Sequence, residues 1–361
     1  MSELFEYKCP NCGGALRFDS TVQQLKCPYC DSIVDVAALS GYDEELRNSR
    51  PDQLNWEQTA GGQWEAGETD RFKVYVCNSC GGEIIADDNT AASKCPYCDN
   101  PVVMKGNLSG ALKPDFIIPF KLSKEQAKAA YHNHLKGKKF LPKVFEDRNH
   151  IDEIKAVYVP FWLFDCDVDA DIRYRGTRTR GWADSENNYL ETSYYSIARS
   201  GTIAFDNVPV DGSSVMSDDL MQSIEPFDFS QAELFSTAYL PGYLADKYDI
   251  DANASIGIAN SRIRSSTEQA FKGTVGNYNS LTVEASSIRL ENGRAKYALY
   301  PVWILNTTYN GERFIFALNG QTGKTVGDLP VSKSAYWANF AKVGVIAAAL
   351  AFGVQMLAYL M

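Results

Sequence analysis

The sequence predicts an α+β protein with two four-cysteine ribbons at its start, a mixed middle domain and one transmembrane helix at its end. Three observations support this prediction. Eight of the nine cysteines form two copies of one spacing pattern, strand-like and helical stretches come in separate groups, and the last 19 residues carry no charge. We place the first ribbon at 1–36, an acidic linker at 37–72, the second ribbon at 73–105, the α+β domain at 113–332 and the transmembrane helix at 340–361.

The cysteine pattern predicts two metal sites. Its copies are Cys9-x2-Cys12-x14-Cys27-x2-Cys30 and Cys77-x2-Cys80-x14-Cys95-x2-Cys98. Four thiolates in two close pairs are what a tetrahedral zinc ion needs, so we expect two zinc ribbons, each with a structural Zn²⁺ closed to water and substrate. Disulfides are the alternative. They require an oxidising compartment, and residues 1–30 lack the apolar core of a signal peptide.

Each cysteine pair is also predicted to lie in a knuckle-like turn. The residue after the second cysteine is Gly13, Asp31, Gly81 or Asp99, and these residue types tolerate the left-handed backbone conformation. Such a turn directs backbone N–H groups at the sulfurs and thereby favours the thiolate.

The charge of the ribbons argues against nucleic-acid binding. Residues 1–36 carry three basic and five acidic side chains, residues 73–105 carry three and four, and the whole chain has a net charge of −10. Neither ribbon has the basic stripe that neutralises phosphates. Contact with protein partners is the favoured use of an acidic ribbon.

The linker at 37–72 is acidic and lacks a clear apolar period, so we expect a mobile or weakly ordered segment. Its Trp56 and Trp64 have two interpretations. They anchor a partner, or they pack on the protein's own surface, and the second interpretation is favoured.

The middle domain is long enough for one substantial core. Ser123 as N-cap and Gln126 three residues later predict a capping box at the start of its first helix. The predicted helices are 123–136, 216–223, 238–248 and 252–271. The predicted strands are 115–120, 157–172, 193–203, 280–290, 298–309 and 313–319.

Asp165, Asp167, Asp169 and Asp171 alternate with Cys166, Val168, Ala170 and Ile172. On a strand the four carboxylates share one face. A cation site is one interpretation, but a solvent-facing row with arginines opposite the acids is favoured. Arg178 and Arg180 are expected in a hairpin partner strand, with Cys166 facing the core.

No catalytic constellation is visible, so we expect a protein that is not an enzyme. The segment from Asn319 to Thr325 has only two residues between Gly320 and Gly323, where a phosphate loop has four, and a hairpin turn is predicted instead. His132, His134 and His150 show no ligand spacing. An enzyme with scattered site residues in the middle domain stays an alternative.

The C-terminal segment predicts a single membrane span. At about 1.5 Å per residue, the uncharged run 343–361 reaches roughly 28 Å, close to the thickness of a bilayer core. Tyr336 and Trp337 precede it like an interfacial aromatic belt, and Lys333 and Lys342 lie on its N-terminal side. We therefore expect a tail-anchored protein in the cell membrane, with the bulk of the chain in the cytoplasm.

Several segments resemble bacterial membrane-anchored TFIIB-type zinc-ribbon proteins, which are often labelled PriA-type replication-restart helicases. The matching segments are Cys77-Asn-Ser-Cys-Gly-Gly-Glu-Ile-Ile, Cys95-Pro-Tyr-Cys, Val159-Pro-Phe-Trp-Leu-Phe-Asp, Val208-Pro-Val-Asp-Gly-Ser-Ser, Tyr243-Leu-Ala-Asp-Lys-Tyr and Asn319-Gly-Gln-Thr-Gly-Lys. The resemblance implies a zinc-binding membrane protein. It also implies protein partners of the phage-shock-protein-A-like or SPFH-like kind, in an envelope-stress response. The chain has no helicase motor signature, so it shares at most the ribbons with that enzyme.

These expectations combine into a membrane-anchored, cytoplasm-facing zinc-binding adaptor that recruits protein partners. A zinc-ribbon nucleic-acid-binding protein that assists transcription or replication is the alternative. The residues leave open any small-molecule ligand, the oligomeric state and whether the two ribbons pack together.

Overall fold

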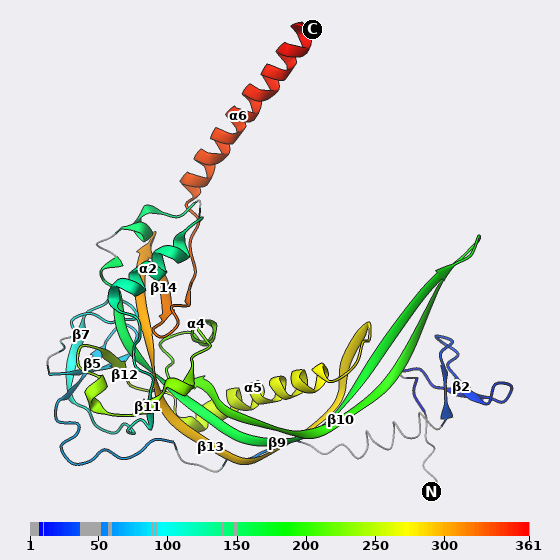
Figure 1. The fold of residues 1–361 in the computed structure, drawn as a ribbon, viewed down its shortest axis with the longest axis horizontal. Coiled ribbons are helices and arrows are strands. Elements are labelled where there is room, and N and C mark those ends of the chain that lie inside the picture. Colours follow the sequence, from blue (N-terminus) through cyan, green and yellow to red (C-terminus); the bar gives the residue numbers. More distant parts are fainter. Residues whose placement is uncertain are drawn as a thin grey trace. The chain divides into compact units, whose positions relative to one another are not determined.

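The computed structural model describes residues 7–9, 11–36, 52–56, 60–88, 90, 92–138, 140–147 and 151–360. The chain divides into two compact units (Figure 1). Unit 1 contains Met1–Gln58, Asp165–Val208 and Gly257–Arg294, and unit 2 contains the other three stretches, Thr59–Phe164, Pro209–Ile256 and Ala295–Met361. This division differs from the predicted domain boundaries because three long strands contribute residues to both units. They are β9 (Lys155–Ala183), β10 (Asn188–Asp211) and β13 (Ser280–Tyr309).

Unit 1 begins with a small antiparallel sheet around the first four cysteines. Its strands, in spatial order, are β1 (Arg17–Asp19), β2 (Gln24–Lys26) and β3 (Ile33–Val34). Part of the predicted acidic linker also belongs to this unit, since β4 (Gln53–Leu54) pairs in parallel with β13. Residues 37–51 and 57–59 of the linker lie outside the described residues.

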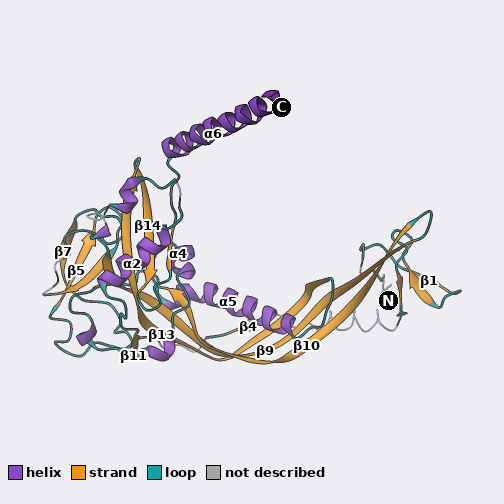
Figure 2. Ribbon diagram, turned by 45° about the horizontal axis from the view of Figure 1, so that its top comes forward, coloured by secondary structure: helices purple, strands orange, loops and turns teal. Residues whose placement is uncertain are grey.

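The core of unit 1 lies between long strands and one helix. The apolar residues Cys166, Val168, Ala170 and Ile172 of β9 are all buried, as the alternating pattern predicts. They pack with residues of β13 and with Ile263 of α5 (Ala252–Gly273). Figures 1 and 2 show α5 running along the long strands.

The opposite face of β9 carries the predicted row of aspartates, but its partners differ from the prediction. Arg178 and Arg180 lie on β9 itself, which continues to Ala183, and not on a hairpin partner. Two of the aspartates instead accept hydrogen bonds from β13. Arg289 donates to Asp169 at 2.6 Å, and Asn292 donates to Asp167 at 2.8 Å. The prediction missed this because it ended the strand at residue 172.

Unit 2 is built on a sheet of short strands that pair with the other ends of β9 and β13. The sheet order is β11-β8-β13-β9-β12-β6-β5-β7, and β14 continues from β13 to β15. The short strands are β5 (Phe72–Cys77), β6 (Glu83–Asp87), β7 (Val102–Asn107), β8 (Phe116–Ile117), β11 (Glu233–Leu234), β12 (Leu244–Asp246), β14 (Glu312–Asn319) and β15 (Thr325–Gly327).

Helix α2 (Lys124–Leu135) covers part of this sheet, and its capping box is confirmed. The backbone N–H of Gln126 donates to Ser123 Oγ at 3.3 Å, and the side chain of Gln126 accepts from the backbone of Ser123 at 2.8 Å. Its buried residues Ala127, Tyr131 and Leu135 are spaced four apart and pack with Trp303 and Phe316 of the sheet. The helix η1 (Lys143–Glu146) follows.

Two further predicted helices are present in α4 (Asp218–Ser223) and α5, but the predicted helix 238–248 is wrong. A short turn, η3 (Thr237–Tyr239), precedes Pro241 and Gly242, whose φ is +85°, and then the chain enters β12. Pairing with β6 and β9 buries β12 and overrides the local helical pattern. Another short turn, η2 (Phe229–Gln231), lies before β11.

The Gly-rich segment forms the predicted hairpin turn between β14 and β15. Asn319 organises this turn. Its Oδ1 accepts from the backbone N–H groups of Gln321 and Thr322, both at 2.9 Å, and its Nδ2 donates to the carbonyls of Ile224 and Pro226 at 3.0 and 3.2 Å.

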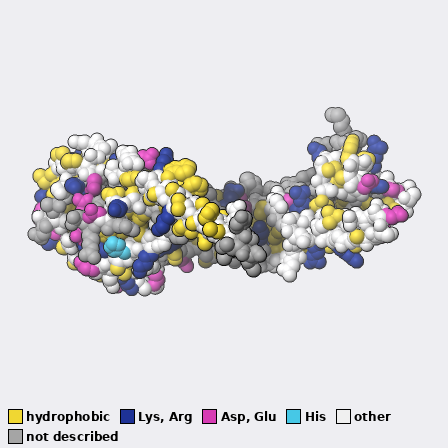
Figure 3. Space-filling model, turned by 90° about the horizontal axis from the view of Figure 1, so that it is seen from above, with side chains coloured by type: hydrophobic (Ala, Val, Ile, Leu, Met, Phe, Trp, Pro, Cys, Tyr) yellow, Lys and Arg dark blue, Asp and Glu magenta, His cyan; other side chains and the backbone are white. Residues whose placement is uncertain are grey.

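The chain ends in α6 (Lys333–Leu360). The 24 residues Lys333–Met356 are long and apolar enough to cross a membrane, and none of the apolar window is buried. Phe340, Val343 and Leu350 are 61, 55 and 66 % exposed. Figure 3 shows hydrophobic side chains gathered along this helix.

Candidate metal centres

The first four-cysteine group converges as the spacing predicts. Sγ of Cys9 lies 3.6 Å from Sγ of Cys30, and Sγ of Cys12 lies 3.4 Å from Sγ of Cys27. The four sulfur atoms lie within 4.8 Å of one another and could hold a metal ion. These separations are much longer than the roughly 2.05 Å of a disulfide bond, and all nine cysteines are free thiols.

The second group, Cys77, Cys80, Cys95 and Cys98, has the same construction. Sulfur separations are 3.4 Å for Cys77–Cys98 and 3.6 Å for both Cys80–Cys95 and Cys80–Cys98. All four sulfurs again lie within 4.8 Å. A tetrahedral ion with bonds of about 2.3 Å to sulfur needs sulfur–sulfur edges of about 3.8 Å. The cysteine positions therefore fit such an ion with little adjustment.

The predicted knuckle turns are present in both groups. The residues after the second cysteine of each pair all have positive φ, at +73° for Gly13, +56° for Asp31, +80° for Gly81 and +58° for Asp99. In each turn this residue donates its backbone N–H to the carbonyl of the first cysteine, at 2.8 to 3.1 Å. The backbone N–H of Asn11 donates to Sγ of Cys9 at 3.4 Å, and the backbone N–H of Tyr97 donates to Sγ of Cys95 at the same distance.

Neighbouring donors stabilise thiolates in each group. Hydrogen bonds from the hydroxyl and backbone of Ser32 lower the pKa of Cys30 to about 6. Burial raises the pKa of Cys98, but hydrogen bonds from the backbone and side chain of Asn100 outweigh it and bring the pKa to about 7. Since metals bind the thiolate, one cysteine of each group is prepared as a ligand. In the second group, burial raises the pKa of Cys80 to about 11 and also raises that of Cys95.

The two groups differ in how they are held. In the first, Cys12 is exposed and Cys30 half-buried, the small sheet β1–β3 lies beside them, and the hydroxyl of Tyr194 in β10 donates to the side chain of Asn11. In the second, Cys77, Cys95 and Cys98 belong to the same apolar core as Val157, Val159 and other sheet residues of unit 2. The second four-cysteine group is thus part of the core of unit 2.

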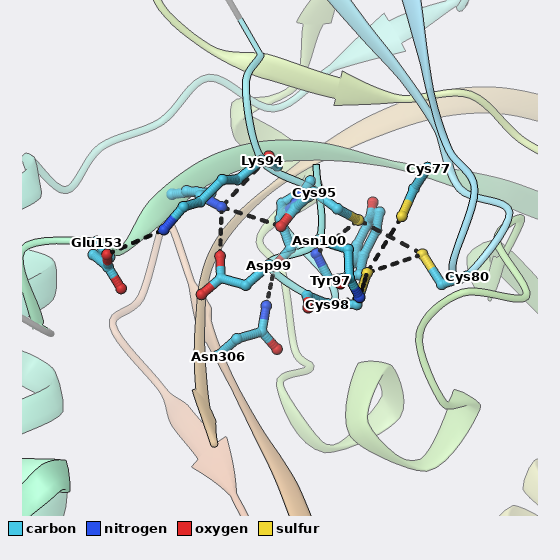
Figure 4. A network of polar contacts seen from close by, with 12 residues as sticks. Cys77, Cys80, Lys94, Cys95, Tyr97, Cys98, Asp99, Asn100, Glu153 and Asn306 are labelled. Carbon is cyan, nitrogen blue, oxygen red and sulfur yellow. Dashed lines mark hydrogen bonds and ion pairs between the residues drawn. The ribbon is translucent and has the colours of Figure 1, made fainter. Parts of the chain in front are cut away.

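Polar contacts bind the second group further into unit 2 (Figure 4). Nζ of Lys155, at the start of β9, lies 2.9 Å from Asp99 Oδ1 and 3.1 Å from the carbonyl of Cys95. The side chain of Asn306 in β13 donates to the carbonyl of Pro96, and Lys94 pairs with Glu153 at 3.5 Å. The sequence contains one signal for these contacts. Asn306 is a polar residue directly after the apolar run Val302-Trp-Ile-Leu.

Other candidates from the sequence take no part in a metal group. Among the described residues, neither the aspartate row nor His132 and His134 forms a cluster of ligands, and His150 lies outside the described residues. Trp56 and Trp64 contact the protein itself, which agrees with the favoured interpretation of the sequence. Nε1 of Trp56 donates to Asn260 at 2.8 Å within unit 1, and that of Trp64 donates to the carbonyl of Ala111 at 3.0 Å within unit 2.

Comparison with known proteins adds one relative. No model of a known protein family matches the chain, and no solved structure matches it. A protein of Bacillus subtilis (strain 168), described as uncharacterized protein YdjG, is 31 % identical over 330 residues, which cover 91 % of each chain. This identity over nearly the full length of both proteins shows common descent, and the chain belongs to the same family as YdjG.

Proposed function

We propose that this protein is a membrane-anchored, cytoplasm-facing zinc-binding adaptor that recruits a protein partner through unit 1. The observation that carries the proposal is a set of large apolar side chains exposed on that unit. Phe18, Tyr29 and Ile33 of the first ribbon are 55, 75 and 55 % exposed, and Trp182 and Leu190 near the end of the β9–β10 pair are 46 and 75 % exposed. Exposed aromatic groups of this kind are typical of protein-recognition surfaces.

The metal is zinc in this proposal. Four thiolates around one ion leave no open coordination position, which is the arrangement of a structural zinc site and not of a catalytic one. The ion then holds the first ribbon rigid, so that its exposed side chains meet a partner at little entropic cost.

The anchor in this proposal is α6, with its lysines Lys333 and Lys342 on the cytoplasmic side. Reduced thiols persist in the cytoplasm, which agrees with metal-binding cysteines in the upstream chain. The resemblance to TFIIB-type zinc-ribbon proteins makes phage-shock-protein-A-like and SPFH-like proteins the first partners to test.

Site-specific photocrosslinking in intact cells tests the adaptor role. A benzophenone side chain at Tyr29 should capture one partner protein, and the additional change Phe18→Asp should abolish the capture. Leu234 is the matched control, because it is also 75 % exposed but lies in unit 2. The same products from both positions, or none from Tyr29, would contradict the proposal.

Metal analysis tests the zinc sites separately. Protein purified with reductant should contain two zinc ions per chain, and Cys9→Ser with Cys12→Ser should remove one of them. Purified protein without zinc, or with iron in its place, would refute this part.

Nucleic-acid binding is a second candidate, because arginines and aromatic rings lie together in unit 1. The guanidinium of Arg178 lies 5.3 and 4.8 Å from the ring centres of Tyr195 and Tyr278, and that of Arg180 lies 5.6 Å from Trp182. Such pairs also form platforms for single-stranded nucleic acid. Fluorescence anisotropy with a single-stranded oligonucleotide distinguishes the candidates, because this binding must weaken steeply with salt and with Arg178→Ala.

A further inference from the structure

Unit 2 contains a cavity of about 670 Å³ beside the second ribbon. Its wall combines the residues just before Cys95, the start of α2, the start of β9, the loop before β12 and Trp303 of β13. Cavities of about 300–1,000 Å³ hold small organic ligands. The volume therefore suits a compact ligand of that size class.

The wall of this cavity is positively charged. Lys94, Lys124 and Lys155 line it, whereas none of its described lining residues is acidic, in a chain whose net charge is −10. Lys94 makes an ion pair with Glu153, whose carboxylate does not line the cavity. Nζ of Lys155 already donates to Asp99 and to the carbonyl of Cys95, so this lysine adds positive charge to the wall and no free donor. An ion pair as exposed as Lys94–Glu153 contributes little and leaves that lysine available to an anion.

Lys124 lies at a helix N-terminus, where a lysine does not stabilise the helix. It is the first residue of α2, next to the N-cap Ser123, which also lines the cavity. A positive side chain at a helix N-terminus is opposed by the helix dipole, whereas a bound anion there is favoured by it. The position of Lys124 thus has an electrostatic reason if an anion binds in the cavity.

Two aromatic rings, Tyr243 and Trp303, line part of the remaining wall and are held by a third ring. The ring of Tyr243 stacks on Phe120 at 4.6 Å, and Trp303 meets the same Phe120 edge-on at 5.3 Å. Trp303 is 5 % exposed, and its Nε1 is buried without a hydrogen-bond partner among the described residues.

We propose that this cavity binds a small organic phosphate, with its phosphate held by Lys94 and Lys124 and its organic part against Tyr243 and Trp303. Lysine recognises phosphate as a point charge, whereas the planar recognition of carboxylates favours arginine, and no arginine lines the cavity. The cavity lies in unit 2 and the exposed apolar side chains lie in unit 1, so this proposal is independent of the adaptor function and adds a ligand-binding role.

Isothermal titration of the detergent-solubilised full chain tests the proposal with ADP, adenosine and inorganic phosphate as probes. We expect saturable binding of ADP, weaker binding of inorganic phosphate and no binding of adenosine alone. ADP affinity should also fall as salt is raised, because the lysines are partly exposed.

A matched pair of variants assigns the binding to this cavity. Lys124→Ala should weaken ADP binding by about tenfold or more, as expected for a lost charge-assisted contact. Lys128→Ala, one turn further along α2, is the control, since Lys128 pairs with Asp152 at 2.6 Å and does not line the cavity. Equal affinities in the two variants, adenosine binding as tight as ADP binding, or no saturable ADP binding by the unmodified chain would overturn the proposal.

Discussion

Asp246 and Asp211 are buried carboxylic acids in unit 2, 1 and 7 % exposed. Burial raises the pKa of Asp246 to about 7, and nearby Asp249 adds to the shift. Burial likewise raises the pKa of Asp211 to about 8, and Asp246 adds to it. An unfolded chain releases these protons near pH 4. At these two groups the folded protein therefore binds more protons than the unfolded chain, and the stability that they contribute falls as pH rises from about 4 to about 8.

The change Asp246→Asn should remove part of this pH dependence. Because the amide carries no charge at any pH, the variant should melt several degrees above the unmodified protein at pH 8 and close to it at pH 5. Thermal unfolding at both pH values measures the effect, with the exposed Asp171→Asn as control. A variant that is less stable at pH 8 would show that Asp246 is ionised and needed as a charge.

Asn319 is a second residue whose contacts predict a large effect. Asn319→Ala leaves two backbone N–H groups and two carbonyls without their partner, at a cost on the order of 2–4 kcal/mol in unfolding free energy. Thr322→Ala in the same turn should cost well under that, since its hydroxyl accepts one long bond of 3.4 Å. Denaturant unfolding of the two variants compares these costs, and equal losses would contradict the role assigned to Asn319.

At the scale of elements, the two four-cysteine groups share a spacing pattern but differ in how they are held. The first is held by its own three short strands, whereas the second shares its core with β9 and β13 and pairs through β6 with β12. Loss of a structural metal removes its binding free energy from whatever depends on that fold. The consequences should therefore be local for the first ribbon and wide for the second.

Hydrogen exchange followed by mass spectrometry measures this difference. Cys95→Ser with Cys98→Ser should reduce protection in β6 and β12 by about tenfold or more, because local opening then costs less free energy. Cys9→Ser with Cys12→Ser should affect only peptides within residues 7–36. If β12 stayed protected in the first variant, the sheet would not depend on the second four-cysteine group.

At the scale of the whole molecule, α6 is a long apolar helix in which none of the apolar window is buried. A helix that is apolar on all sides is stable only inside a core or a bilayer. By contrast, α2 and α5 each bury residues of one face in an apolar core.

Deletion of residues 335–361 should move the protein from the membrane fraction to the soluble fraction. A milder test is Ala349→Arg with Leu350→Arg, since each arginine near the middle of a span costs about 2.5–3.5 kcal/mol on insertion scales. Ser334→Arg at the start of the helix is the control and should leave the protein in the membrane. Retention of the deletion variant in membranes after a carbonate wash would contradict the anchor.

The sequence by itself determined the features that depend on neighbouring residues. The cysteine spacing and the left-handed residues after each pair specify the knuckles, Ser123 and Gln126 specify the start of α2, and the alternation around Cys166 specifies a half-buried strand. The uncharged C-terminal run specifies a helix for an apolar environment. These features can be predicted from the sequence because turn geometry, helix capping and side-chain periodicity depend on residues only a few positions apart.

Only the tertiary structure decided which elements meet. Residues 244–246 became a strand because β6 and β9 pair with them, against a local helical pattern. Asn306 and Lys155 reach the second ribbon from strands 210 and 56 residues away in sequence, and Lys124 joins the wall of a cavity built from five separate segments. Such contacts depend on the free energy of burying and pairing distant segments together, and no local pattern in the chain records that energy.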